Sequence, residues 1–189
     1  MLRLYILKMN YLINFLSESV FTGACAGMVL LLVFSFISIK PFFNRRILIQ
    51  TINITLLIGG TANFVALGVS SIRTFLSGNE EAGYSFLNRF FGLYWYAGWI
   101  LLFIWIFLPQ VFWFRKPRIS LGWLVIVVSI QLLFRLFLFA EESYLIGQSS
   151  WSIIHAFSLT DYFEHLGLYL IISGLLYYGL TKRKQSELP

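Results

Sequence analysis

Five long runs of apolar residues, bounded by charged residues, proline or polar clusters, take up most of this chain. A helix needs about 20 apolar residues to cross the roughly 30 Å of hydrocarbon in a bilayer. Runs of about that length occupy residues 15–39, 47–76, 90–114, 119–140 and 161–180. Only 12% of the residues are charged, against about 25% in soluble proteins. The sequence therefore predicts an integral membrane protein.

The predicted fold is all-α, a polytopic helix bundle that forms a single membrane domain over residues 1–189. Strands of a membrane barrel would show segments of about 10 residues that alternate between apolar and polar. Residues 101–107 and 121–130 are instead almost continuously apolar. A secretory signal is not expected, because the basic Arg3 and Lys8 precede a run too long for one.

The basic residues predict an orientation, because short loops rich in Lys and Arg stay in the cytoplasm. The loops after the first, third and fifth runs carry nine basic residues: Lys40, Arg45, Arg46, Arg115, Lys116, Arg118, Lys182, Arg183 and Lys184. The other side carries four: Arg3, Lys8, Arg73 and Arg89. Seven of the eight acidic residues also fall there: Glu18, Glu80, Glu81, Glu141, Glu142, Asp161 and Glu164. Five spans are therefore predicted, with the N-terminus outside and the C-terminus in the cytoplasm.

Small residues in the first run predict a packing face. Ser19, Gly23 and Gly27 lie four residues apart, so they share one side of a helix. Membrane helices associate through such flat faces, because lipid gives them no hydrophobic drive to pack. Cys25 lies in the same run and is interpreted as another small packing residue.

Arg135 is the ionisable residue that lies most clearly inside a predicted span, and such residues are costly in lipid. Gln131, Arg135 and Glu142 share one helix face at i, i+4 and i+11. Two interpretations stay open. Arg135 either snorkels and pairs with an acidic residue, Glu141, Glu142 or Glu164, or belongs to a polar pocket near the outer surface.

Two further polar groups are candidates for function. Asn53, Thr61 and Asn63 lie within the second run and suit either hydrogen bonds between helices or a path for protons or water. Asp161 and His165 lie one helical turn apart, so the carboxylate could orient the imidazole to accept a proton from a quinol. The simpler interpretation of the second pair is a solvated outer rim.

No metal, haem or covalently bound cofactor is expected. A b-type haem would need axial ligands on facing helices. The two histidines, His155 and His165, do not meet this requirement, because His155 precedes the fifth run and the two do not share a face. No Cys, His and carboxylate cluster has zinc-like spacing, and no glycine-rich loop matches a nucleotide motif. The sequence therefore predicts neither enzyme chemistry by the chain alone nor nucleic-acid binding.

Two motifs carry a resemblance to a known family. They are YSFLNRFFGLYW at residues 84–95 and LPQVFWFRK at residues 108–116. In this order they resemble the NrfD/polysulfide-reductase-type membrane subunits, most closely those of alternative complex III, over about Asn63 to Leu180. Pro109 also removes a backbone donor and frees a carbonyl, beside which Gln110 can hydrogen-bond while Trp113 anchors the interface.

The resemblance implies a quinol-interacting membrane subunit of a respiratory complex in the bacterial inner membrane, with haem or iron–sulfur partner subunits. Two features depart from the family: five spans make about one bundle where members have two, and Phe134 stands where members have glutamate before Arg135. The leading hypothesis is a subunit that contributes to or flanks a quinol site through Arg135, Asp161 and His165. The alternatives are a purely structural scaffold subunit and a small transporter or channel.

Overall fold

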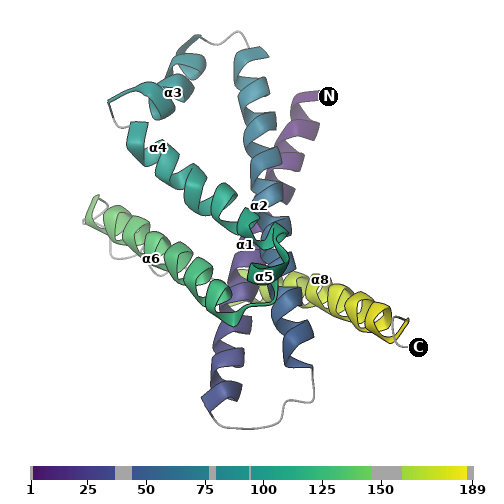
Figure 1. Ribbon diagram of the computed structural model, residues 1–189. Helices are drawn as coiled ribbons and strands as arrows, with labels where there is room; N and C mark the ends of the chain where they lie inside the picture. The colour runs from purple at the N-terminus through teal and green to yellow at the C-terminus, as the bar shows by residue number, and fades with distance from the viewer. Residues whose placement is uncertain (1, 37–43, 77–79, 94, 146–158, 187–189) are drawn as a thin grey trace.

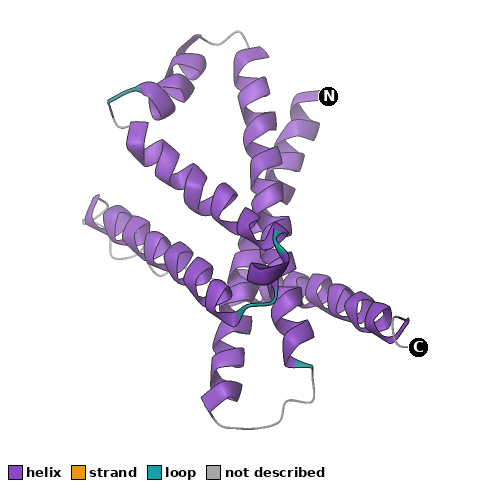
Figure 2. Ribbon diagram, in the orientation of Figure 1, coloured by secondary structure: helices purple, strands orange, loops and turns teal. Residues whose placement is uncertain are grey.

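The structure is a computed structural model that describes residues 2–36, 44–76, 80–93, 95–145 and 159–186. Within these ranges every regular element is a helix, which confirms the predicted all-α fold there (Figure 2). In chain order the elements are α1 (Leu2–Phe36), α2 (Arg45–Leu76), α3 (Glu80–Phe91), α4 (Trp95–Leu102), the π-helix η1 (Phe103–Phe107), the 3-10 helix η2 (Leu108–Trp113), α5 (Arg115–Arg118), α6 (Leu121–Leu145) and α8 (Leu159–Ser186).

Three helices are long and apolar enough to cross a membrane, within the part of the chain that the structure describes. They are Phe15–Val33 in α1, Arg45–Leu76, which is all of α2, and Phe163–Lys184 in α8. Two shorter apolar helical segments, Gly98–Trp113 and Leu121–Phe137, lie where the third and fourth runs were predicted. The count of five spans and their orientation stay predictions.

The third predicted span, residues 90–114, is not one continuous α-helix. Helix α3 ends at Phe91, and a turn at Gly92 leads into α4. The Gly92 N–H donates to the Asn88 carbonyl at 2.9 Å, and the Trp95 N–H donates to the Gly92 carbonyl at 3.2 Å. A Cβ at Gly92 would overlap the Asn88 side chain, so only glycine fits this turn. Hydropathy alone does not reveal such a backbone break.

A second irregularity lies at Pro109, where a π-helix changes into a 3-10 helix. In a π-helix each N–H bonds the carbonyl five residues earlier, and Pro109 has no N–H for the Ile104 carbonyl. The Gln131 side chain from α6 donates to that carbonyl at 3.2 Å. Gln110 donates to the Ile106 carbonyl at 3.1 Å, which confirms its predicted hydrogen bond to the backbone beside the proline.

The core lies where α1 and α2 cross each other and meet η2 and the first half of α6 (Figure 1). Its buried residues are Val20, Ala24, Met28, Leu31, Ile49, Ile52, Leu56, Leu57, Phe112, Leu124, Val127 and Val128. Thr51 and Thr55 are buried beside them, and each hydroxyl donates to the carbonyl four residues earlier at 2.9 Å. The burial of these threonines therefore leaves neither hydroxyl without a hydrogen-bond partner.

Helices α6 and α8 leave this crossing on opposite sides of the α1–α2 pair (Figure 1). Beyond Gln131, most of the described side chains of α6 are exposed, with Leu133 and Phe137 above 60% exposure. In the described part of α8 one residue, Tyr169, is buried. Helix α6 adds Leu124, Val127 and Val128 to the core, and α8 contacts both α1 and α2. These contacts position the candidate site.

Candidate functional site

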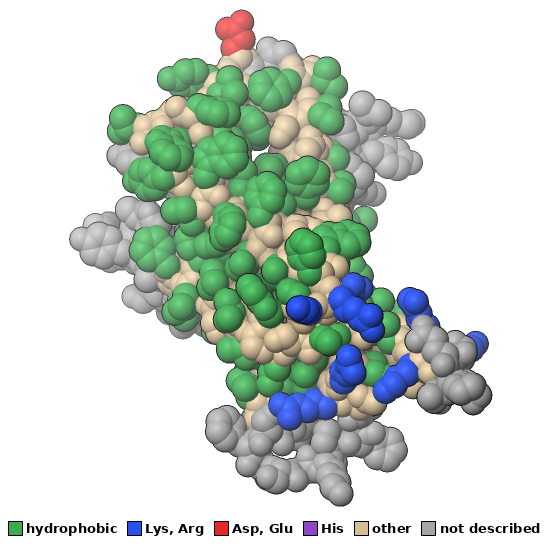
Figure 3. Space-filling view, viewed as in Figure 1, with side chains coloured by type: hydrophobic (Ala, Val, Ile, Leu, Met, Phe, Trp, Pro, Cys, Tyr) green, Lys and Arg blue, Asp and Glu red, His purple; other side chains and the backbone are tan. Residues whose placement is uncertain are grey.

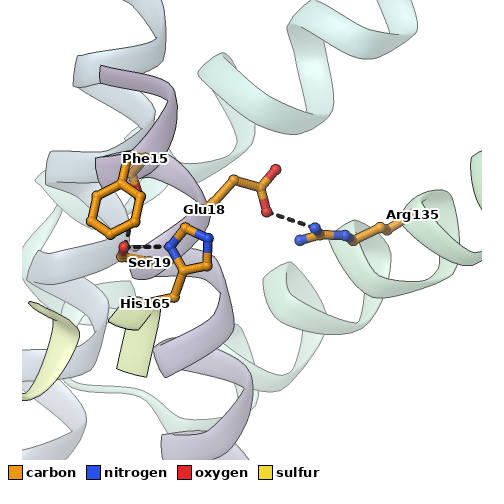
Figure 4. A network of polar contacts seen from close by, with 5 residues as sticks. All are labelled: Phe15, Glu18, Ser19, Arg135 and His165. Carbon is orange, nitrogen blue, oxygen red and sulfur yellow. Dashed lines mark hydrogen bonds and ion pairs between the residues drawn. The ribbon is translucent and has the colours of Figure 1, made fainter. Parts of the chain in front are cut away.

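Two consecutive residues of α1, Glu18 and Ser19, receive polar side chains from two other helices (Figure 4). Arg135 of α6 forms an ion pair with Glu18, with 2.6 Å between Nη2 and Oε2. His165 of α8 hydrogen-bonds Ser19, with 2.8 Å between Nδ1 and Oγ. The α1 helix is therefore the common point of contact for both groups.

The packing of α8 on α1 explains how His165 reaches Ser19. Gly23 lies one turn after Ser19, and Tyr169 lies one turn after His165. A Cβ at Gly23 would overlap the Tyr169 ring, so the absence of a side chain there admits the ring. Gly27 lies one turn further, and a Cβ there would be 3.2 Å from the Tyr169 hydroxyl oxygen. The predicted small-residue stripe thus lies where α1 and α8 cross.

The Ser19 hydroxyl has two partners and one hydrogen. Its Oγ lies 2.7 Å from the Phe15 carbonyl oxygen, to which it donates. With that hydrogen engaged, His165 donates its Nδ1–H to Ser19, and in the neutral form of the imidazole Nε2 is the acceptor nitrogen. The Phe15 ring covers the imidazole with 4.5 Å between centroids. His165 Nε2 has no hydrogen-bond partner within the described part of the chain.

Arg135 has a partner other than those predicted from the sequence. Glu141, Glu142 and Glu164 were named as candidates, whereas the guanidinium pairs with Glu18 and also lies over the Phe21 ring, 5.3 Å from its centroid. Both charged side chains are about half exposed, at 44% and 45%. Glu18 is the one acidic residue in the first apolar run, and that isolation was the signal that could have identified it.

Gln131 lies one turn before Arg135 but faces the core instead of the ion pair. Its side chain is 2% exposed, and its Nε2 donates to the freed Ile104 carbonyl. Its Oε1 has no partner among the described residues. The predicted face of Gln131, Arg135 and Glu142 is therefore divided between a buried backbone contact and an exposed ion pair. The Glu142 side chain lies outside the described part of the structure.

The Asp161 side chain also lies outside the described residues, as does all of His155. The pairing of Asp161 with His165 therefore stays a prediction. Ser19 had been interpreted as a packing residue, and it is also the hydrogen-bond partner of this imidazole. Hydroxyl residues on a small-residue stripe were the available signal for that contact.

The three residues proposed as a polar path lie in different surroundings. The Asn53 amide is fully buried and donates to the Arg118 carbonyl at 2.9 Å and, more weakly, to those of Pro117 and Ser120 at 3.4 Å. Thr61 donates to the Leu57 carbonyl of its own helix at 2.9 Å. Asn63 is half-buried and lines a groove of about 310 Å³ between α2, α3, α4 and η1. Thr61 thus bonds within its own helix, whereas Asn53 joins α2 to α5.

The long apolar helices and the all-helical fold define the class of this chain as a helical membrane protein. In the portion that the structure describes, no three His, Cys, Asp or Glu side chains lie together as metal ligands would. Comparison with protein-family models, curated proteins and solved structures finds no match to the chain. The family resemblance therefore rests on the two motifs quoted above.

Proposed function

We propose that the chain is an integral membrane subunit of a bacterial respiratory electron-transfer complex, of the quinol:acceptor oxidoreductase type, and that it contributes to or flanks a quinol site. The observation that carries the proposal is the convergence of Arg135 and His165 from separate helices on Glu18 and Ser19 (Figure 4). Ionisable residues inside a membrane domain are costly and are functional candidates for that reason.

The chemistry of quinol oxidation suits this cluster. A quinol loses two electrons and, from its hydroxyl groups, two protons, so its site needs a proton acceptor within hydrogen-bond reach. His165 Nε2 is the acceptor nitrogen when Nδ1–H is donated to Ser19. When the quinol ring is half oxidised, one of its oxygens carries negative charge, and the half-exposed Arg135 can bind that oxygen. The electrons would pass to a haem or iron–sulfur group of a partner subunit, so the chain is not catalytic alone.

The proposed topology has five spans, with the N-terminus outside and the C-terminus in the cytoplasm. Figure 3 supports it: the visible Lys and Arg side chains gather toward one end of the molecule, and the visible acidic ones lie at the opposite end. Along the chain, basic residues occur at the start of α2, in α5 and at the end of α8. Basic residues in every second loop are expected if the chain crosses the bilayer twice between one such loop and the next. The Glu18–Arg135 pair then lies toward the outer side.

The second candidate function is a structural scaffold in the same kind of complex. One observation favours it: Arg135 is already paired with Glu18, and Ser19 already accepts from His165, so the polar groups satisfy one another without a ligand. In that case they hold α6 and α8 against α1 and contact no quinol. The two candidates predict different results when His165 is replaced.

The test is purification of the complex from native membranes in mild detergent, followed by replacement of His165. Co-purifying haem or iron–sulfur subunits are expected, identified by spectra and mass. His165→Ala should lower quinol oxidation about a hundredfold, the typical contribution of a proton-transfer group. Glu164→Ala, at the exposed adjacent position, is the matched control and should keep its rate. An intact complex that oxidises quinol normally with His165→Ala would leave the scaffold as the function.

The topology has a separate test, which labels single cysteines from outside the cell with a membrane-impermeant maleimide. In a Cys25→Ser background, Glu80→Cys at the start of α3 should be labelled in intact cells. Lys116→Cys in α5 should be labelled only after the cells are broken. Equal labelling of both positions in intact cells would contradict the five-span arrangement.

A further inference from the structure

A second groove, of about 610 Å³, lies along α2 and ends at Trp113 and Arg118. Its wall in α2 is formed by side chains three or four residues apart: Ile54, Leu57, Ile58, Thr61, Ala62 and Val65. Residues at this spacing share one helix face. The eleven-residue step from the first to the last rises about 17 Å along the helix axis. The groove is therefore long, and its wall in α2 is apolar apart from Thr61.

The polar groups of the groove are satisfied within the protein, with one exception. Thr61 donates to the Leu57 carbonyl, and the Trp113 indole N–H donates to Gln110 Oε1 at 2.7 Å. Arg118 is different, because a guanidinium has five N–H donors. Its Nη2 donates to the Trp113 carbonyl at 3.2 Å, and it makes no other side-chain hydrogen bond within the described ranges. One end of an otherwise apolar groove thus offers positively charged donors.

The position of Arg118 is fixed by a contact made on its backbone. The buried Asn53 amide of α2 donates to the Arg118 carbonyl at 2.9 Å. This bond joins the short helix α5 to the same helix that forms the groove wall. The exposed Arg115 and Lys116 precede Arg118 in α5 and add to the positive charge at this end. Figure 3 shows Lys and Arg side chains beside apolar surface in this part of the molecule.

We propose that this groove binds one anionic phospholipid, with an acyl chain along α2 and the phosphate at Arg118. The apolar length matches a chain, and the cationic end matches a phosphate with net negative charge. A zwitterionic headgroup would bring its own cation toward Arg115 and Lys116, which disfavours it. The exposed Trp113 would then lie at the headgroup level, where aromatic residues anchor membrane proteins. This inference is independent of the proposed respiratory function.

The first test is native mass spectrometry of the purified full-length chain with phosphatidylglycerol or with phosphatidylcholine of the same acyl chains. Phosphatidylglycerol should bind more tightly. Arg118→Gln should weaken its binding about fivefold, the effect of one basic residue near an anionic surface. Lys182→Gln is the matched control, because Lys182 is an exposed basic residue of α8 that does not line the groove. An equal loss for both variants would show only general attraction and overturn the site.

The second test separates the lipid from a free phosphate and examines the groove itself. Ala62→Phe should fill the groove and abolish the preference for phosphatidylglycerol while Arg118 remains. Glycerol phosphate, a headgroup without chains, should not displace the lipid. Full binding by Ala62→Phe, or displacement by glycerol phosphate, would overturn the proposal. If circular dichroism shows that Ala62→Phe loses helix, Val65→Trp, at the half-exposed far end of the groove, gives the same test.

Discussion

The α1–α2 pair and α8 are all long apolar helices, but the rest of the chain covers them to different extents. In their apolar segments 44% of the residues of α1 and 39% of those of α2 are buried, against 6% in α8. The first two helices share a core, whereas α8 is held by a few separate contacts. They include Tyr169 on Gly23, His165 on Ser19 and the Tyr177 hydroxyl, which accepts the Asn44 N–H at 3.1 Å.

The difference shows how a membrane helix can have a defined position without a core of its own. Lipid is as apolar as leucine, so burial of apolar side chains does not drive α8 toward α1. Close approach at Gly23 and hydrogen bonds at Ser19 must supply the attraction instead. The exposed sides of α6 and α8 remain for lipid or for another subunit. Three experiments test this contrast between a packed pair and an attached helix.

The largest effect is expected for Gly23→Ala, because a methyl group there overlaps the Tyr169 ring. Overpacking of this kind costs about 1–3 kcal/mol in free energy of unfolding. Gly174→Ala is the matched control, since no atom lies within 4 Å of a Cβ at that position of α8. Unfolding in mixed detergent and SDS, followed by circular dichroism, measures both. Equal stability of the two variants would mean that Gly23 does not fix α8.

A smaller loss of stability is expected for Gln131→Leu, which changes the packed interior and not the contact between α8 and α1. The change leaves the buried Ile104 carbonyl without its donor, at a cost of about 1–2 kcal/mol in free energy of unfolding. Leu133→Ala, two residues further along α6 and 66% exposed, is the control and should unfold nearly as the unchanged protein does. The same detergent titration applies. A stabilised Gln131→Leu would show that water or a rearranged backbone satisfies the carbonyl.

The smallest effect is expected for the Glu18–Arg135 pair, because both side chains are nearly half exposed. A double-mutant cycle with Glu18→Gln and Arg135→Gln should give a coupling of about 0.5–1 kcal/mol in free energy of unfolding. The coupling should decrease as salt is added. A value of zero would mean that the pair does not help to hold α6 on α1. A value of several kcal/mol would place the pair away from water.

Part of the candidate site could be predicted from the sequence. The small-residue stripe and His165 were both identified, but their contact was not, because it needs the crossing of α1 and α8. Arg135 was identified and its partner was not, since Glu18 lies 117 positions earlier in the chain. Pairs within one helix follow from a spacing of three or four residues, whereas pairs between helices depend on how the helices cross.

The amino-acid sequence by itself determined that the chain is helical and apolar enough for a membrane, because runs of 20 apolar residues allow no other backbone structure in lipid. The sequence also indicated that Pro109 leaves a carbonyl without its donor. Only the tertiary structure decided that the third run is broken at Gly92, and that Gln131 donates to the carbonyl freed at Pro109. The reason is physical. Hydropathy follows side chains along the chain, whereas a missing backbone hydrogen bond is satisfied by whichever helix packs beside it.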